Sequence, residues 1–158
     1  MSDPSLLVLN GPGLANMEEF ADDTLGITSL KLIQHSCTAL CANLGLTLDF
    51  RQSDNQDEVV RWVREDANQF DALIINQMGC AERTSIDYAK YCADLEVLSQ
   101  VTCRVTEIHM TNVLRYDEGA FKALRGPDGK TALICGLGAD SYHVAIRAAV
   151  RLLTEGAS

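Results

Sequence analysis

Basic side chains are scarce in this sequence, and their scarcity argues against one class of function. The chain has 13 Lys and Arg against 22 Asp and Glu, a formal net charge of −9, and its basic residues are scattered rather than clustered. A protein that binds nucleic acid needs a concentrated positive surface to neutralise phosphate groups. We therefore expect no nucleic-acid partner.

Long apolar runs are missing as well. The longest run spans only a few residues, whereas a helix that crosses a membrane needs about 20. The opening MSDPSLLVLN does not have the basic, then apolar, then small-residue order of a signal peptide. We expect a soluble, cytoplasmic protein with no membrane partner.

Motifs for disulfides, metals and nucleotide cofactors are also lacking. The six cysteines form no CxxC pair, so we expect reduced, mostly buried thiols. His35, Cys37 and Cys41 fall on one predicted helix, but their face is otherwise apolar, which favours core packing over a metal site. GPGLAN at 11–16 and GLGADS at 136–141 lack the third glycine of the dinucleotide fingerprint. We expect no metal and no other cofactor.

What the sequence does contain is the composition of a globular domain. Its 158 residues are 47% hydrophobic and 22% charged, which is typical of folded proteins and not of disordered ones. A chain of this size buries roughly two-thirds of the surface that it exposes when unfolded. No linker, repeat or low-complexity segment divides it, so we expect a single domain over residues 1–158.

Short apolar strands alternate with amphipathic helices along the chain. Because parallel strands need crossover connections, this alternation predicts an α/β fold, a flavodoxin-like three-layer sandwich with a five-stranded parallel sheet and helices on both faces. The predicted strands are 6–10, 46–51, 72–76, 103–109 and 131–136. The predicted helices run from a cap at Thr28 or Ser29 to Gly45, over 59–70, from Thr84 or Ser85 through Val97, over 117–124, and onward from a cap at Asp140 or Ser141.

Polar residues occupy the carboxyl ends of the predicted strands, where an open parallel sheet binds its ligand. They are Asn10, Arg51, Asn76 and His109. The amides and the guanidinium can hydrogen-bond a polyhydroxylated or carboxylate ligand, and the histidine can carry a proton, which suggests a small polar substrate. Structural roles are the alternatives: Asn10 can close a turn, Arg51 can pair with Asp49 or Asp54, and a lone histidine is often structural.

These strand ends and turns also carry the pattern of a known family. LLVLNGPGL, LDFRQSD, LIIN followed by Thr84 and Ser85, EIHMTN and ICGLGADSYHVAIRA occur in this order over nearly the whole chain. In these motifs the chain resembles type II dehydroquinase, the 3-dehydroquinate dehydratase of the shikimate and quinate pathways. The resemblance implies a cofactor-free dehydration next to a carbonyl group, and assembly into trimers that are grouped into dodecamers.

The resemblance also implies roles for individual residues. Asn76 matches the asparagine whose bound water stabilises the enolate, and His109 matches the acid that protonates the departing hydroxyl. Met110 and Thr111 match the pair that holds the substrate carboxylate. Other positions that fall in the substrate site but differ from the family pattern are Gly13, Arg83 and Arg115. The Arg83 guanidinium can clamp a carboxylate, and the alternative is a plain surface charge.

The family's general base, a lid tyrosine activated by an arginine, has no direct counterpart in this sequence. The family's lid arginine and tyrosine align with Phe20 and Leu25, neither of which can accept a proton. Carboxylates of the same segment are candidate replacements, although they can equally form a solvated loop. These candidates are Glu18, Glu19, Asp22 and Asp23, with Tyr116 and Cys80 as further ones.

Two functions stay open on the sequence. One is a hydro-lyase like 3-dehydroquinate dehydratase that acts on a small cyclic hydroxy-keto carboxylic acid, either dehydroquinate or a related substrate. The alternative is a non-catalytic family member that binds carboxylates or serves as a scaffold.

Overall fold

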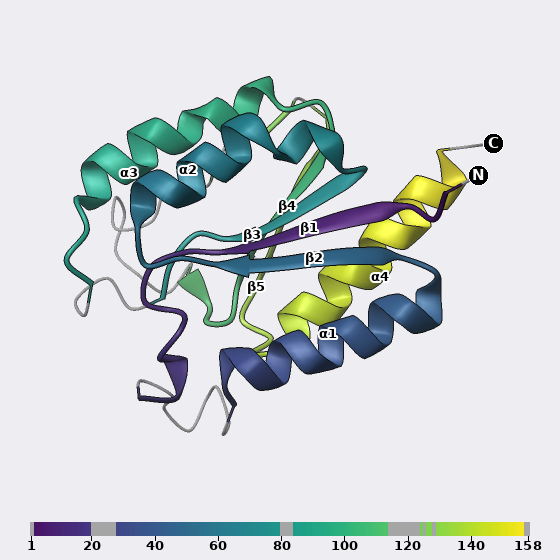
Figure 1. The fold of residues 1–158 in the computed structure, drawn as a ribbon, viewed down its shortest axis with the longest axis horizontal. Helices are drawn as coiled ribbons and strands as arrows, with labels where there is room; N and C mark the ends of the chain where they lie inside the picture. Colours follow the sequence, from purple (N-terminus) through teal and green to yellow (C-terminus); the bar gives the residue numbers. More distant parts are fainter. Residues whose placement is uncertain are drawn as a thin grey trace.

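Five parallel strands form the centre of the molecule (Figure 1). The computed structural model describes residues 2–19, 28–79, 84–113, 124, 126–127 and 129–156, apart from the side chain of Glu19. The strands lie in the order β2-β1-β3-β4-β5, which confirms the predicted flavodoxin-like arrangement. Their bounds are β1 (Ser5–Asn10), β2 (Thr47–Gln52), β3 (Ala72–Asn76), β4 (Arg104–His109) and β5 (Thr131–Cys135).

Helices cover both faces of this sheet. α1 (Leu30–Leu44) and α4 (Asp140–Glu155) lie on one face, and α2 (Gln56–Glu65) and α3 (Tyr88–Asp94) lie on the other (Figure 1). Among the described residues, no helix is both long enough and apolar enough to cross a membrane. The described 3-10 helices are η1 (Met17–Glu19), η2 (Ala67–Gln69) and η4 (Leu95–Gln100).

Each face of the sheet has its own apolar core, because side chains alternate along a strand. Leu6 and Val8 of β1 pack with α1 and α4, whereas Leu7 and Leu9 pack with α2 and α3. All four are fully buried. Strands that are apolar at nearly every position are typical of a parallel sheet covered on both faces.

Residues at the two ends of α1 determine where that helix begins and ends. The Ser29 hydroxyl accepts a hydrogen bond from the N–H of Leu32 at 3.2 Å. Gly45 follows the helix with φ 68°, a left-handed conformation that glycine adopts without strain. The structure therefore confirms the predicted cap at Ser29 and the predicted end at Gly45.

The predictions for the next two helices are wrong at their ends. The helix predicted over 59–70 ends at Glu65, because Asp66 leaves it and forms an ion pair with Arg51, and a 3-10 turn follows. The helix predicted from Thr84 or Ser85 begins only at Tyr88. The Asp87 carboxylate caps this helix by accepting a hydrogen bond from the N–H of Lys90 at 3.0 Å, and the segment around Val97 is the 3-10 helix η4.

The last helix begins without either of the predicted caps. Its N-cap residue is Ala139, which makes no side-chain cap. Asp140 is already the first helical residue, where a negative charge is favourable. Ser141 donates its hydroxyl to the carbonyl of His109 at 3.4 Å. The hydroxyl that was predicted to cap the helix therefore binds β4 instead. The helix predicted over 117–124 lies outside the described residues except for Leu124.

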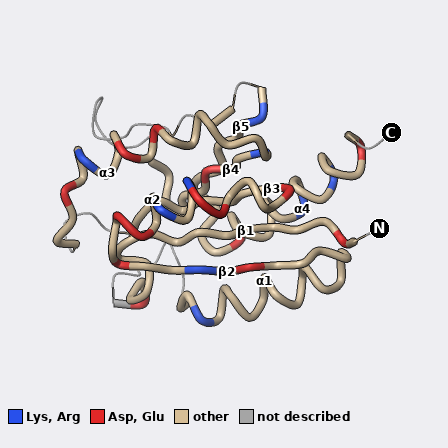
Figure 2. The backbone as a smooth tube through the Cα atoms, turned by 45° about the horizontal axis from the view of Figure 1, so that its top comes forward, with Lys and Arg blue, Asp and Glu red and all other residues tan. Residues whose placement is uncertain are grey.

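Charged side chains of the described residues form local pairs. Figure 2 shows the basic residues in short, separate stretches, several of them beside acidic ones. Lys90, for example, pairs with Asp57 and Asp94, and Arg151 pairs with Glu155 one helical turn away. Positive charge is therefore dispersed over the described surface.

Candidate functional site

The sheet brings three of the predicted site residues to one edge. Asn10 and Asn76 end β1 and β3 and lie directly opposite each other in the strand register. His109 ends β4, the next strand along. The order of the strands reverses between β1 and β3, which is where open parallel sheets form their ligand crevice.

The side chains of these residues leave the sheet on different faces. Asn10 and Asn76 follow Val8 and Ile74 by two positions and share their face, towards α1 and α4. His109 follows Val105 by four positions and shares its face, towards α2 and α3. The structure therefore places the asparagines and the histidine at one edge, with their side chains on opposite faces of the sheet.

A tyrosine of α4 joins the two asparagines. The Tyr142 hydroxyl donates to Oδ1 of Asn10 at 2.6 Å and accepts from Nδ2 of Asn76 at 3.0 Å. Nδ2 of Asn10 donates in turn to the carbonyl of Arg51 on β2 at 2.9 Å. All three side chains are buried, so this chain of bonds satisfies amide groups that would otherwise be costly inside the protein.

His109 is held by a carboxylate from its own strand. Nε2 of His109 lies 2.7 Å from Oε1 of Glu107, and Glu107 is 1% exposed. The other oxygen of Glu107 accepts from the N–H of Leu124 at 2.7 Å. Gln77, the residue after β3, donates from Nε2 to Oε1 of Glu107 at 3.3 Å, and within the described part of the chain its own buried Oε1 has no hydrogen-bond partner.

This arrangement is suited to moving a proton. A histidine whose ring nitrogen is bound to a fixed carboxylate keeps one ring orientation, as general acids and bases require. The carboxylate is fixed because three donors point at its two oxygens. His109 is itself largely buried at 8% exposed.

Two further predicted residues follow His109 directly. Met110 is buried in the core beneath α1 and α4, and its carbonyl accepts from the N–H of Gly138 at 2.9 Å. Thr111 is half-buried. Gly13 lies after β1 and donates its N–H to Oδ1 of Asp54 at 3.1 Å, so it stands at the same edge as the strand ends.

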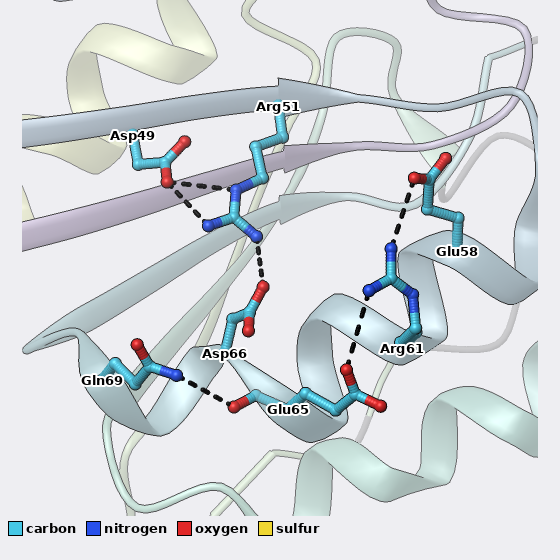
Figure 3. A network of polar contacts seen from close by, with 7 residues as sticks. All are labelled: Asp49, Arg51, Glu58, Arg61, Glu65, Asp66 and Gln69. Atoms are coloured by element: carbon cyan, nitrogen blue, oxygen red, sulfur yellow. Dashed lines mark hydrogen bonds and ion pairs between the residues drawn. The ribbon is translucent and has the colours of Figure 1, made fainter.

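Arg51 has a structural role. Its guanidinium pairs with Asp49 and Asp66 and lies over the ring of Trp62, 5.6 Å from the ring centre. Figure 3 shows Arg51 with its two aspartates beside a second cluster, in which Arg61 bridges two glutamates of α2. Of the two partners predicted for Arg51, Asp49 is confirmed, whereas Asp54 binds Gly13 instead.

Several predicted residues lie outside the described part of the chain. Glu18 is described and is exposed in η1. The residues outside are Arg83, Arg115, Asp22, Asp23, Phe20, Leu25, Tyr116, Cys80 and the side chain of Glu19.

The described thiols lie mainly in the core. Cys37, Cys41 and Cys103 are buried and free. Burial raises the pKa of Cys37 to about 12 and that of Cys41 to about 11. Among the described residues, no group of three or more His, Cys, Asp or Glu is placed to hold a metal ion. His35 lies on α1 with the first two thiols.

Three residues of this edge were not predicted from the sequence. Glu107 could have been found, because it is a charged residue two positions before His109 in a buried strand and must share the face of the histidine. Tyr142 fits the apolar pattern of α4, so nothing in the sequence indicates that its hydroxyl forms hydrogen bonds at this edge. Gln77 follows a strand, and nothing local indicates its contact with Glu107.

Comparison with known proteins assigns the chain to a family. Residues 4–150 match the family model described as Dehydroquinase class II. The chain is 32% identical over 151 residues to a 3-dehydroquinate dehydratase of Sinorhizobium medicae, and the match covers 96% of each chain. It is also 32% identical over 148 residues to catabolic 3-dehydroquinase 2 of Neosartorya fischeri, covering 94% of this chain and 93% of that protein.

Solved structures show the same fold. The crystal structure of type II dehydroquinase from Propionibacterium acnes superposes with a TM-score of 0.73 at 22% identity, covering 95% of this chain and 98% of that one. A 3-dehydroquinate dehydratase-like protein from Bifidobacterium longum superposes with a TM-score of 0.62 at 23% identity. The family match and the two relatives confirm the resemblance drawn from the motifs, and the chain belongs to the class II dehydroquinase family.

Proposed function

We propose that this protein is a hydro-lyase that removes water from a small cyclic hydroxy-keto carboxylic acid, and that 3-dehydroquinate is its substrate. Two curated relatives at 32% identity carry names that state this activity or this substrate. The single observation that carries the proposal is the contact between His109 and buried Glu107 at the carboxyl edge of the sheet.

His109 acts as the general acid. Hydroxide is a poor leaving group, so its departure needs a proton from a positioned donor. Glu107 keeps the ring in place through the 2.7 Å contact with Nε2. Asn76 provides the amide that holds the water stabilising the enolate, and Met110 and Thr111 hold the carboxylate. Arg83, Arg115 and Gly13 complete the binding of the substrate.

The base that removes the proton comes from the acidic segment after β1. Glu18 is exposed in η1, so its carboxylate is open to solvent. Glu19, Asp22 and Asp23 are the other candidates. Glu18→Gln should lower kcat if Glu18 is the base and leave it unchanged if one of the others is.

The proposal is tested by incubating the purified protein with 3-dehydroquinate and following the ultraviolet absorbance of the conjugated enone product. Removing a general acid costs about 10²–10⁴ in rate, so His109→Ala should lose that much of kcat. His143→Ala is the matched control, because this histidine of α4 contacts only Ser36 among the bonds described for it, at 3.0 Å.

Each outcome decides between the functions. Turnover that depends on His109 and not on His143 supports the lyase. Saturable binding of dehydroquinate without turnover contradicts the lyase and supports a carboxylate-binding protein. Absence of both turnover and binding contradicts both and leaves a scaffold role.

The protein also assembles, in this proposal, into a homo-oligomer built from trimers, and its 158 residues form one domain. β5 is an edge strand whose first three residues are exposed. Leu133 on it and Leu137 just after it are 41% and 52% exposed, so this edge offers apolar side chains that a second copy of the chain can cover. Light scattering after gel filtration should give three times the 17.2 kDa of one chain, or a multiple of that. A mass of one chain contradicts the assembly.

A further inference from the structure

The bonds that link Asn10, Tyr142 and Asn76 have a direction that chemistry imposes. The Arg51 carbonyl can only accept, so Asn10 must turn its Nδ2 towards it and its Oδ1 towards the tyrosine. The phenol must then give its one proton to Asn10 and can only accept from Nδ2 of Asn76. A backbone carbonyl of β2 therefore decides how the amide of Asn76 on β3 is turned.

Burial makes this direction difficult to reverse. Asn10 and Tyr142 are 0% exposed and Asn76 is 2% exposed, so solvent cannot replace a broken bond cheaply. The ring of Phe50 packs against that of Tyr142 with centroids 6.2 Å apart. Burial also raises the pKa of the Tyr142 hydroxyl, which therefore stays protonated and able to donate.

We propose that Tyr142 is the positioning residue for Asn76 in the reaction. Its hydroxyl fixes the amide so that one N–H and the carbonyl oxygen of Asn76 always face the same way at the edge of the sheet. A water that binds there beside the substrate finds a donor and an acceptor already oriented. This inference rests on the proposed function, which assigns Asn76 to the enolate.

The place of Tyr142 in the fold agrees with this role. It reaches from α4 to the ends of β1 and β3, the two strands between which the strand order reverses. Because it is fully buried, it acts through Asn76 and does not touch the substrate. If the Asn76 amide were rotated by 180°, its carbonyl oxygen would lie where an N–H donor is needed. An oxygen acceptor there would disfavour the negative charge that develops on the enolate.

The first test is the kinetics of Tyr142→Phe, which removes the hydroxyl and keeps the ring. Misplacing a group that acts on the transition state can cost about 10²-fold in rate, so kcat should fall by about 10- to 100-fold while KM changes little. The control is Ser36→Ala, which removes the contact with His143 between α1 and α4, the same pair of helices. This variant should keep the wild-type kcat.

The second test needs no turnover. In nuclear magnetic resonance spectra of the wild-type protein, the Tyr142 hydroxyl proton should be protected from exchange with water and close to the amide groups of both asparagines. In Tyr142→Phe that resonance is lost, and the Asn76 side-chain amide should shift and exchange faster. The Asn10 amide should change less, because its bond to the Arg51 carbonyl remains.

The two tests separate failure of the inference from failure of the proposed function. A Tyr142→Phe kcat within twofold of wild type, or an equal loss in Ser36→Ala, overturns the positioning role. A hydroxyl proton that exchanges freely overturns the fixed direction. If the wild-type protein has no turnover, the proposed function fails, and the spectra alone decide whether Tyr142 fixes Asn76.

Discussion

Replacing Glu107 by glutamine should both destabilise the protein and impair His109. The carboxylate receives three donors: His109 and Gln77 on one oxygen and the Leu124 N–H on the other. A glutamine of the same shape has one oxygen and one NH₂ group. If the oxygen stays with the histidine, the NH₂ faces the Leu124 N–H, and two donors oppose each other inside the protein.

The size of the effect follows from these contacts. A hydrogen bond to a charged group contributes about 1.5–3 kcal/mol, and a buried donor left without a partner costs about 1–3 kcal/mol. Because the two losses overlap, Glu107→Gln should lower the free energy of unfolding by about 2–4 kcal/mol. Total stabilities are about 5–15 kcal/mol, so the variant should still fold and can be assayed.

Urea unfolding followed by circular dichroism measures the loss of stability, and turnover of 3-dehydroquinate measures the effect on the histidine. With the imidazole no longer held, kcat should fall by about 10²-fold or more. Asp71→Asn is the matched control, since its carboxylate accepts from the N–H and hydroxyl of Ser5 at 2.7 and 2.9 Å, at the opposite end of the sheet and in an exposed place. This control should change stability by less than about 1 kcal/mol. A Glu107→Gln variant as stable and as active as the control would refute the reasoning.

Two other predictions concern the core. The pKa values of Cys37 and Cys41 are raised by burial from 9.0 to about 12 and about 11, so above pH 9 the unfolded chain ionises first and stability declines. At pH 10 the loss is on the order of 1 kcal/mol for each thiol, and urea midpoints between pH 8 and pH 10 should fall less in the Cys37→Ala variant. Gly11→Ala should cost about 3 kcal/mol or more, because a Cβ there would lie 1.7 Å from the carbonyl oxygen of Gln77. Gly45→Ala should cost about 1–2 kcal/mol in the same unfolding assay, because no described atom lies within 4 Å of the added Cβ and only the left-handed conformation is strained. Equal costs for the two variants would contradict the close approach at Gly11.

Local patterns in the sequence were enough to predict most of the fold. The apolar runs at 6–10 and 72–76 became β1 and β3 because a strand without polar positions is stable only inside a covered sheet. Ser29 and Gly45 determined the ends of α1 through bonds that span only a few residues. The strand ends were found for the same reason, and with them Asn10, Asn76 and His109 as residues of one edge.

Tertiary contacts determined the hydrogen-bond and ion-pair partners near the carboxyl edge of the sheet. Asp66 forms an ion pair with Arg51 where the sequence pattern predicted a helix, and Ser141 donates its hydroxyl to the carbonyl of His109 where the pattern predicted a helix cap. Such partners lie far away in the sequence, so no pattern of neighbouring residues indicates them.

The residues that end the strands, and the family that the motifs indicate, could be predicted from the order of the amino acids alone. The directions of the side chains could not: Asn76 turns towards α4, while His109 turns towards Glu107 and Gln77 on the other face. The cause is the register between strands. The alternation of side chains along one strand is a local property, but the face that a strand turns to a given helix depends on its pairing across the sheet. A shift of one residue in that pairing would exchange the two faces.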